Sequence, residues 1–146
     1  MDAGQLMPNL PEHLVWLNVE KQDAQIRPGS DTYLLYFWSM ECPACQMISS
    51  RLTKIQKDPS QVQVIYIHVP LFEEEKSIER VQAKITKLHL KAPVVLDHQY
   101  EVVKLFGVEG LPSVYLFDQD RRLIYFGMGE EAYHDAMQSL DHATTA

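Results

Sequence analysis

The chain has 146 residues, of which 46% are hydrophobic and 23% charged, so it is long enough to bury the core of one domain. Thirteen lysines and arginines against 20 aspartates and glutamates give a net charge of −7, which argues against a nucleic-acid surface. No apolar run approaches the roughly 20 residues that a membrane span needs, and the first residues lack the positive start and apolar run of an export signal.

The first 30 residues differ in composition from the rest of the chain. They contain three of the eight prolines, Pro8, Pro11 and Pro28. Between these prolines, a short apolar alternation over residues 13–19 is typical of an edge strand or of a segment packed across the core. We expect residues 1–30 to be an N-terminal extension packed on a single domain of residues 31–146.

A buried strand followed by a helix is predicted at the start of that domain. Residues 33–38 form a continuous apolar and aromatic run, as in a strand buried on both faces. From Ala44, apolar residues recur at three- and four-residue steps until Asp58-Pro59, which predicts a helix. Cys42 and Cys45 therefore lie between the strand and the first turn of the helix.

The remaining elements alternate between strands and helices. We predict a strand over 62–69, a helix over 73–90, a strand over 93–97, a helix over 101–106, a hairpin of 113–117 with 123–126, and a helix over 130–140. This order predicts an α/β fold in which helices flank a central mixed β-sheet.

The position of the cysteine pair suggests redox chemistry. Cys42 would lie at the carboxyl end of a buried strand, where helix amides and the helix dipole stabilise a thiolate. Cys45 is three residues further, close enough for a disulfide. We therefore predict that Cys42 attacks and Cys45 resolves the mixed disulfide. Pro43 suits the first helical turn. Neither residue between the cysteines is charged and Glu41 opposes ionisation slightly, so we expect a mild potential weighted towards reduction.

Two other interpretations of this pair are a zinc site and inert buried cysteines. Zinc needs four ligands, usually from two such pairs or from one pair with spaced histidines. The chain has no second pair, and its six histidines are scattered without ligand-like spacing. We therefore expect no bound metal and no bound cofactor.

A second motif runs from Gly107 to Phe117, with Pro112 at the mouth of an apolar strand. A proline there belongs at the first strand residue or in a tight turn, where a cis peptide bond is plausible. If Pro112 faces the dithiol, the backbone of Leu111 can pair with an extended partner segment. The alternative is an ordinary turn proline.

The run from Phe37 to Cys45, combined with Gly110-Leu111-Pro112-Ser113, resembles the thioredoxin superfamily from about Thr32 to the end of the chain. The strand-helix segment between Val62 and Leu90 is similar to that of the TlpA/ResA type of thiol-disulfide oxidoreductase. The resemblance implies a thioredoxin-like fold with an inserted strand-helix segment. It also implies that Cys42 is the nucleophile, that Cys45 resolves, and that Leu111 and Pro112 form the substrate-binding loop.

We place Pro43 and Trp38 at the same substrate-binding surface, with Trp38 packing under the active-site loop. Two positions depart from the family pattern. Tyr36 occupies the place of a buried acid, and Glu41 occupies that of the tryptophan before the first cysteine. Deprotonation of Cys45 then depends on water, on another acid or on Tyr36, which predicts slow resolution. His68 ends a predicted strand near the site, but we interpret it as a solvated or capping residue.

The leading functional hypothesis is a thiol-disulfide oxidoreductase that reduces or exchanges disulfides in protein partners. Because Leu111 keeps the site apolar, we expect extended protein segments as partners, together with an unidentified electron donor or acceptor. The alternative is a non-enzymatic thioredoxin-like module that binds a partner or senses redox state. A peroxidase is a weaker alternative, since the Pro-x-x-x-Thr-x-x-Cys context of peroxiredoxins is missing from the sequence.

The expected compartment depends on whether Met1 is the native start. If it is, the protein is expected in the cytoplasm, where the pair would be kept mostly reduced. The alternative, typical of the TlpA/ResA type, is an exported, membrane-tethered protein whose anchor has been removed. We expect a monomer that has no membrane span in this chain and that binds no nucleic acid.

Overall fold

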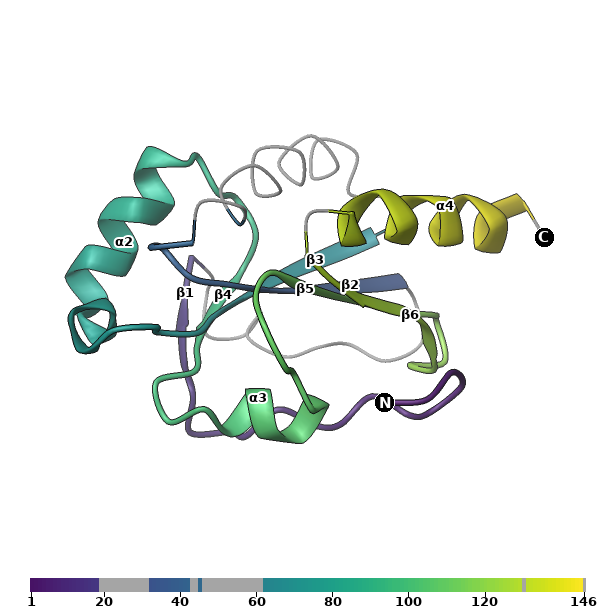
Figure 1. The fold of residues 1–146 in the computed structure, drawn as a ribbon, viewed down its shortest axis with the longest axis horizontal. Helices are drawn as coiled ribbons and strands as arrows, with labels where there is room; N and C mark the ends of the chain where they lie inside the picture. Colours follow the sequence, from purple (N-terminus) through teal and green to yellow (C-terminus); the bar gives the residue numbers. More distant parts are fainter. Residues whose placement is uncertain (19–31, 43–44, 46–61, 130, 146) are drawn as a thin grey trace.

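The computed structural model describes residues 1–18, 32–42, 45, 62–129 and 131–145. Helices lie on both sides of a central sheet (Figure 1). Helix α2 (Ile78–Lys87) and helix α4 (Ala132–Thr145) cover one face, and α3 (Glu101–Phe106) covers the other with the N-terminal segment. The predicted α/β architecture is confirmed. The predicted helix over 44–57 lies outside the described residues, apart from Cys45.

The sheet has six strands in the order β1-β4-β3-β2-β5-β6. Their bounds are β1 Val15–Leu17, β2 Thr32–Trp38, β3 Val62–His68, β4 Val94–Leu96, β5 Ser113–Phe117 and β6 Leu123–Met128. Strands β2, β3 and β4 are parallel, whereas β1, β5 and β6 pair antiparallel with their neighbours. The sheet is therefore mixed, as predicted, and the carboxyl ends of β2 and β3 meet at one edge.

Strand β2 is buried on both faces, which explains its continuous apolar sequence. Leu34, Tyr36 and Trp38 belong to the core under α2 and α4, while Leu35 and Phe37 belong to the core under α3. Each large side chain buried in this way contributes roughly 1.5–3 kcal/mol. The strand that precedes the cysteines is thus fixed from both sides.

The segment predicted as one helix over 73–90 is two elements, and that prediction is wrong in this respect. A 3-10 helix, η2 (Glu73–Lys76), comes first and ends at Ser77, whose backbone is extended (φ −70°, ψ 117°). The Ser77 side chain then accepts a hydrogen bond of 3.3 Å from the backbone N–H of Arg80. Ser77 is therefore an N-cap that starts α2 afresh.

The N-terminal residues contact both edges of the sheet. Strand β1 pairs antiparallel with β4, which confirms the predicted edge strand. At the opposite edge, the Gly4 N–H donates to the Leu123 carbonyl and the Leu123 N–H donates to the Gln5 carbonyl, each at 2.9 Å. The boundary between an extension and a domain at residues 30 and 31 stays a prediction. Among the described residues, none of the helices has the length and apolar composition to cross a bilayer.

Candidate active site

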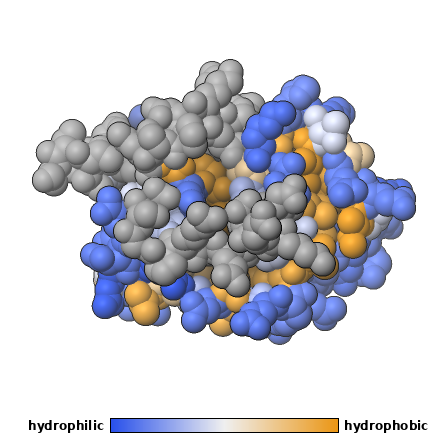
Figure 2. Space-filling model, turned by 180° about the vertical axis from the view of Figure 1, so that it is seen from behind, coloured by the Kyte–Doolittle hydropathy of each residue, from blue (hydrophilic) through white to orange (hydrophobic). Residues whose placement is uncertain are grey.

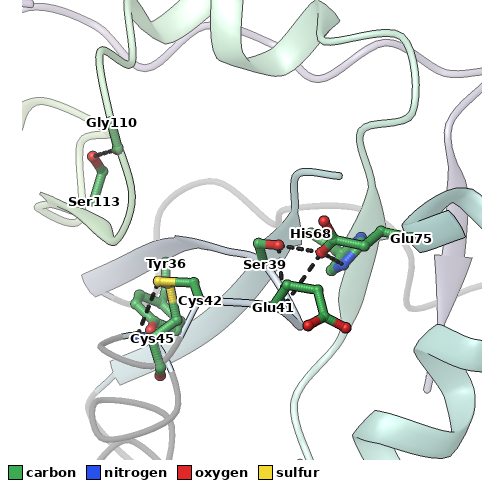
Figure 3. The surroundings of a disulfide bond; sticks show 9 residues. All are labelled: Tyr36, Ser39, Glu41, Cys42, Cys45, His68, Glu75, Gly110 and Ser113. Atoms are coloured by element: carbon green, nitrogen blue, oxygen red, sulfur yellow. Dashed lines mark hydrogen bonds and ion pairs between the residues drawn. A yellow bond between two sulfur atoms is a disulfide. The ribbon is translucent and has the colours of Figure 1, made fainter. Parts of the chain in front are cut away.

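Cys42 and Cys45 form a disulfide directly after β2 (Figure 3). A turn leads from the strand to the pair, because the Cys42 N–H donates to the Ser39 carbonyl at 3.2 Å. The two Cα atoms are 5.2 Å apart, an ordinary separation for a disulfide. Cys42 is 9% exposed and Cys45 is 0% exposed, so a partner reaches Cys42 first. The predicted redox pair is present as a bonded pair.

The Leu111–Pro112 loop lies at the same end of the sheet. The peptide bond between these residues is cis, and Ser113 directly after them pairs with Phe37 of β2. The Ser113 hydroxyl donates to the Gly110 carbonyl at 2.6 Å, which closes the loop. In Figure 3 this loop lies on the same side of the view as the disulfide. Pro112 is buried and Leu111 is half-buried.

Gly110 allows another residue to lie against this loop. A Cβ atom at position 110 would be 2.6 Å from Sδ of Met128, which is closer than real contacts. Met128 belongs to the edge strand β6 and is 56% exposed. An exposed apolar side chain therefore lies beside the loop that precedes Pro112.

Two of the residues assigned to the substrate-binding surface need comment. Trp38 is 0% exposed and packs against His68, with ring centroids 5.0 Å apart. It lies under the active-site turn, so its assignment to a surface that a partner contacts is wrong, and its role is packing. Pro43 lies outside the described residues.

The sequence did not reveal a buried carboxylate that contacts the turn before Cys42. Glu75 is 1% exposed, and its Oε2 accepts hydrogen bonds from the backbone N–H groups of Leu71 at 2.6 Å and Phe72 at 2.9 Å. Its Oε1 accepts from the Ser39 hydroxyl and lies 3.4 Å from the Glu41 nitrogen. Glu75 thus joins the turn after β3 to the turn before Cys42 (Figure 3).

The spacing from Phe72 to Glu75 contained a signal for this contact. Phe72 is the N-cap of η2 and Glu75 is its third helical residue, where a glutamate commonly bonds back to the N-cap amide. In the sequence, Glu73, Glu74 and Glu75 form the acidic start of the helix predicted over 73–90. Glu73 and Glu74 are exposed in the structure, whereas Glu75 is buried.

His68 is buried and not solvated, so that part of the sequence interpretation is wrong. It ends β3 with 0% exposure. Burial lowers the pKa of His68 to about 4, although the charge of Glu75 acts in the opposite direction. His68 is therefore neutral near pH 7, and the 3.7 Å between its Nε2 and Glu75 Oε1 is not an ion pair there. Among the described residues, no partner lies within 3.5 Å of either ring nitrogen of His68 in hydrogen-bonding geometry.

Tyr36 lies in β2 directly below the cysteines. Its hydroxyl donates a hydrogen bond of 2.6 Å to the Cys45 carbonyl. The side chain at the expected position of an acid thus binds the backbone of the resolving cysteine. Among the described residues, no group of three or more His, Cys, Asp or Glu side chains is arranged to hold a metal ion.

Comparison with known proteins agrees with this geometry. A family model described as thioredoxin-like matches residues 29–123. The chain belongs to the thioredoxin-like family. It is 39% identical over 141 residues to the thioredoxin-like protein SkfH of Bacillus subtilis, covering 96% of this chain and 98% of SkfH. It is 23% identical over 117 residues to sporulation thiol-disulfide oxidoreductase A of Bacillus subtilis, covering 80% and 71% of the two chains.

Solved structures show the same thioredoxin-like fold. A thioredoxin-like protein in its oxidised form superposes with a TM-score of 0.85 at 24% identity, covering 97% of this chain and 99% of that one. StoA from Bacillus subtilis gives a TM-score of 0.66 at 20% identity, covering 90% and 98%. With relatives named thiol-disulfide oxidoreductase and its own Cys-x-x-Cys disulfide, this thioredoxin-like protein is a thiol-disulfide oxidoreductase, which makes it an enzyme.

Proposed function

We propose that the protein reduces or exchanges disulfides in protein partners through Cys42 and Cys45. The observation that carries this proposal is the difference in exposure within the bonded pair. Cys42 keeps 9% of its surface exposed, whereas Cys45 has none. A partner sulfur can therefore meet Cys42 but not Cys45, as a two-step exchange requires.

The reaction is a pair of thiol-disulfide exchanges that transfers two electrons. The Cys42 thiolate attacks one sulfur of a partner disulfide, forming a mixed disulfide and releasing the other partner sulfur as a thiolate, which takes up a proton. Cys45 loses its proton, and its thiolate attacks Sγ of Cys42, which forms the Cys42–Cys45 disulfide and releases the second partner thiolate. A separate dithiol donor then reduces the pair. This chemistry uses no bound metal or cofactor.

Carboxylates near Cys42 favour the reducing direction. Glu41 precedes Cys42 and is exposed, and the buried Glu75 contacts the Glu41 amide. Negative charge near a thiol disfavours its thiolate, and strong oxidants are those in which the reduced form is stabilised. We therefore infer that the Cys42–Cys45 pair is weighted towards donating electrons.

Some exposed apolar side chains belong to the turns around the active site and suit an extended protein segment. Nine large hydrophobic residues of the described chain are exposed: Leu6, Val15, Leu71, Phe72, Ile78, Tyr100, Leu105, Phe126 and Met128. Seen from behind, hydrophobic surface emerges in patches among hydrophilic side chains (Figure 2). Leu71 and Phe72 belong to the turn held by Glu75, and Met128 lies beside the Pro112 loop. Such side chains favour apolar partner residues on either side of the attacked sulfur.

Catalysed reduction of a protein disulfide tests this function. Insulin is reduced by dithiothreitol with and without the protein, and Cys42→Ser is the matched variant. We expect acceleration by the wild type and none by Cys42→Ser, because the attacking sulfur is then missing. Acceleration that persists in Cys42→Ser, or a wild type without any effect, would contradict the proposal.

A further inference from the structure

The carboxylate of Glu75 is buried without a compensating positive charge in the described part of the chain. Its nearest ionisable partner is His68 at 3.7 Å, and His68 is neutral near pH 7 because burial lowers its pKa to about 4. A buried charge is costly unless hydrogen bonds satisfy it. Glu75 is therefore retained at this position by the donors around it, and those donors belong to two different turns.

One of these turns leads to the nucleophile. Oε1 of Glu75 accepts from the Ser39 hydroxyl, and the Glu41 nitrogen lies 3.4 Å from the same oxygen. The Ser39 carbonyl in turn accepts from the Cys42 N–H at 3.2 Å. A continuous set of hydrogen bonds thus runs from Glu75 through the turn of residues 39–42 to the backbone of Cys42.

The other turn holds Glu75 in place. The N–H groups of Leu71 and Phe72 donate to Oε2, so the carboxylate is anchored to the turn that follows β3. Strands β2 and β3 are paired along their whole length, from Thr32 with Val62 to Trp38 with His68. Glu75 is therefore bound to the turn after β3, and β3 is paired with β2, the strand that precedes the cysteines.

We propose that Glu75 is a positioning residue that fixes the turn before Cys42 and thereby shifts the dithiol-disulfide equilibrium towards the disulfide. The inference rests on the proposed function of Cys42 and Cys45. A fixed turn holds Cys42 where Cys45 can reach it, which raises the effective concentration of one thiol at the other. The negative charge of Glu75 also disfavours the Cys42 thiolate. Both effects favour the disulfide and make the reduced enzyme a better electron donor.

The chain provides its own control, because three glutamates stand in a row and only the third is buried. The experiment equilibrates wild type, Glu75→Gln, Glu74→Gln, Ser39→Ala and the double variant of Glu75→Gln with Ser39→Ala in reduced and oxidised glutathione. Unpaired cysteines are then alkylated and counted by mass. A glutamine keeps the shape of Glu75 but loses its charge and presents N–H groups to backbone donors.

We expect the equilibrium constant for disulfide formation to fall about three- to tenfold in Glu75→Gln, which is the size of the net contribution of one ordinary hydrogen bond. Ser39→Ala shifts it less in the same direction, and Glu74→Gln leaves it unchanged. Because Ser39 acts through Glu75, the double variant should show much less than the product of the two single effects.

A purely structural role would lower stability without moving this equilibrium. An unchanged constant in folded Glu75→Gln, or independent effects of the two substitutions, overturns the inference. If Glu75→Gln does not fold, the equilibrium constant is measured in Ser39→Ala instead. A wild-type value of that constant in Ser39→Ala also overturns the inference. The proposed function is judged separately by insulin reduction with the wild type, so its failure is distinguishable from this one.

Discussion

The hydroxyl of Tyr36 donates a hydrogen bond of 2.6 Å to the backbone carbonyl of Cys45. This bond attaches the resolving cysteine to the central strand β2. The hydroxyl binds the carbonyl of Cys45, and Tyr36 occupies the place where a buried acid was expected. The stability that this bond provides can therefore be tested separately from the route by which Cys45 loses its proton.

Removal of the Tyr36 hydroxyl should destabilise the protein without removing its disulfide. Tyr36→Phe leaves a buried carbonyl without this donor, which costs about 1–2 kcal/mol. The free energy of unfolding from denaturant titration measures the loss. Tyr125→Phe is the control, because its hydroxyl makes an exposed contact of 3.4 Å with Asp135. An equal loss in both variants would contradict a special role for the Tyr36 bond.

Cys45→Ser should trap the enzyme on its partner. Cys42 still attacks, but without the resolving sulfur the mixed disulfide persists, and it is detectable by mass or on a non-reducing gel. In the wild type, Tyr36 occupies the place of the acid that would help Cys45 lose its proton. We therefore expect slower resolution than in an ordinary thioredoxin, measured in a single turnover. Normal turnover by Cys45→Ser would show that the two-cysteine mechanism is wrong.

His68 predicts a loss of stability on mild acidification. Its pKa is lowered from 6.5 to about 4 in the fold, so between these values the unfolded chain binds a proton that the folded protein does not. Its contribution is complete above pH 6.5 and is lost as the pH falls towards 4. From about pH 7.5 to about pH 5 the wild type should lose about 2 kcal/mol more than His68→Gln. Denaturant titrations at both pH values decide this, and parallel losses would contradict burial of a neutral His68.

Met128 should contribute to the binding of protein disulfides but not of small-molecule disulfides. Its side chain lies against Gly110 beside the Pro112 loop and is 56% exposed. Met128→Ser should raise KM for a protein disulfide about threefold or more, while the rate with oxidised glutathione stays the same. Val15→Ser, on β1 at the opposite edge of the sheet, is the control. Equal effects on both substrates would argue against a docking role for Met128.

The strands could be predicted closely because burial on both faces dictates their composition. The apolar run over 33–38 and the segment over 62–69 differ by only one residue from β2 and β3. The cysteines and Pro112 could be placed from the same logic, since each directly follows or precedes a buried strand. These features depend on local sequence and on strand order, and both can be inferred from the pattern of apolar residues.

Glu75 and His68 could not be assigned from the sequence because their burial depends on two distant turns meeting. A glutamate in a charged run is ordinarily exposed, and nothing local indicates that the Ser39 hydroxyl and the Glu41 amide lie beside it. The break at Ser77 was hidden for a similar reason, since Glu73 to Leu90 has a continuous helical pattern. The compartment and the monomeric state stay predictions of the sequence.

The most direct test of the redox account is the reduction potential of the Cys42–Cys45 pair. The protein is equilibrated in thiol buffers of graded poise, and alkylated cysteines are counted by mass. The account predicts a single two-electron transition at about −250 mV or below, as for a protein that donates electrons. A potential above about −200 mV would contradict the reducing direction, and a pair that forms no disulfide at any poise would contradict the enzyme's proposed chemistry altogether.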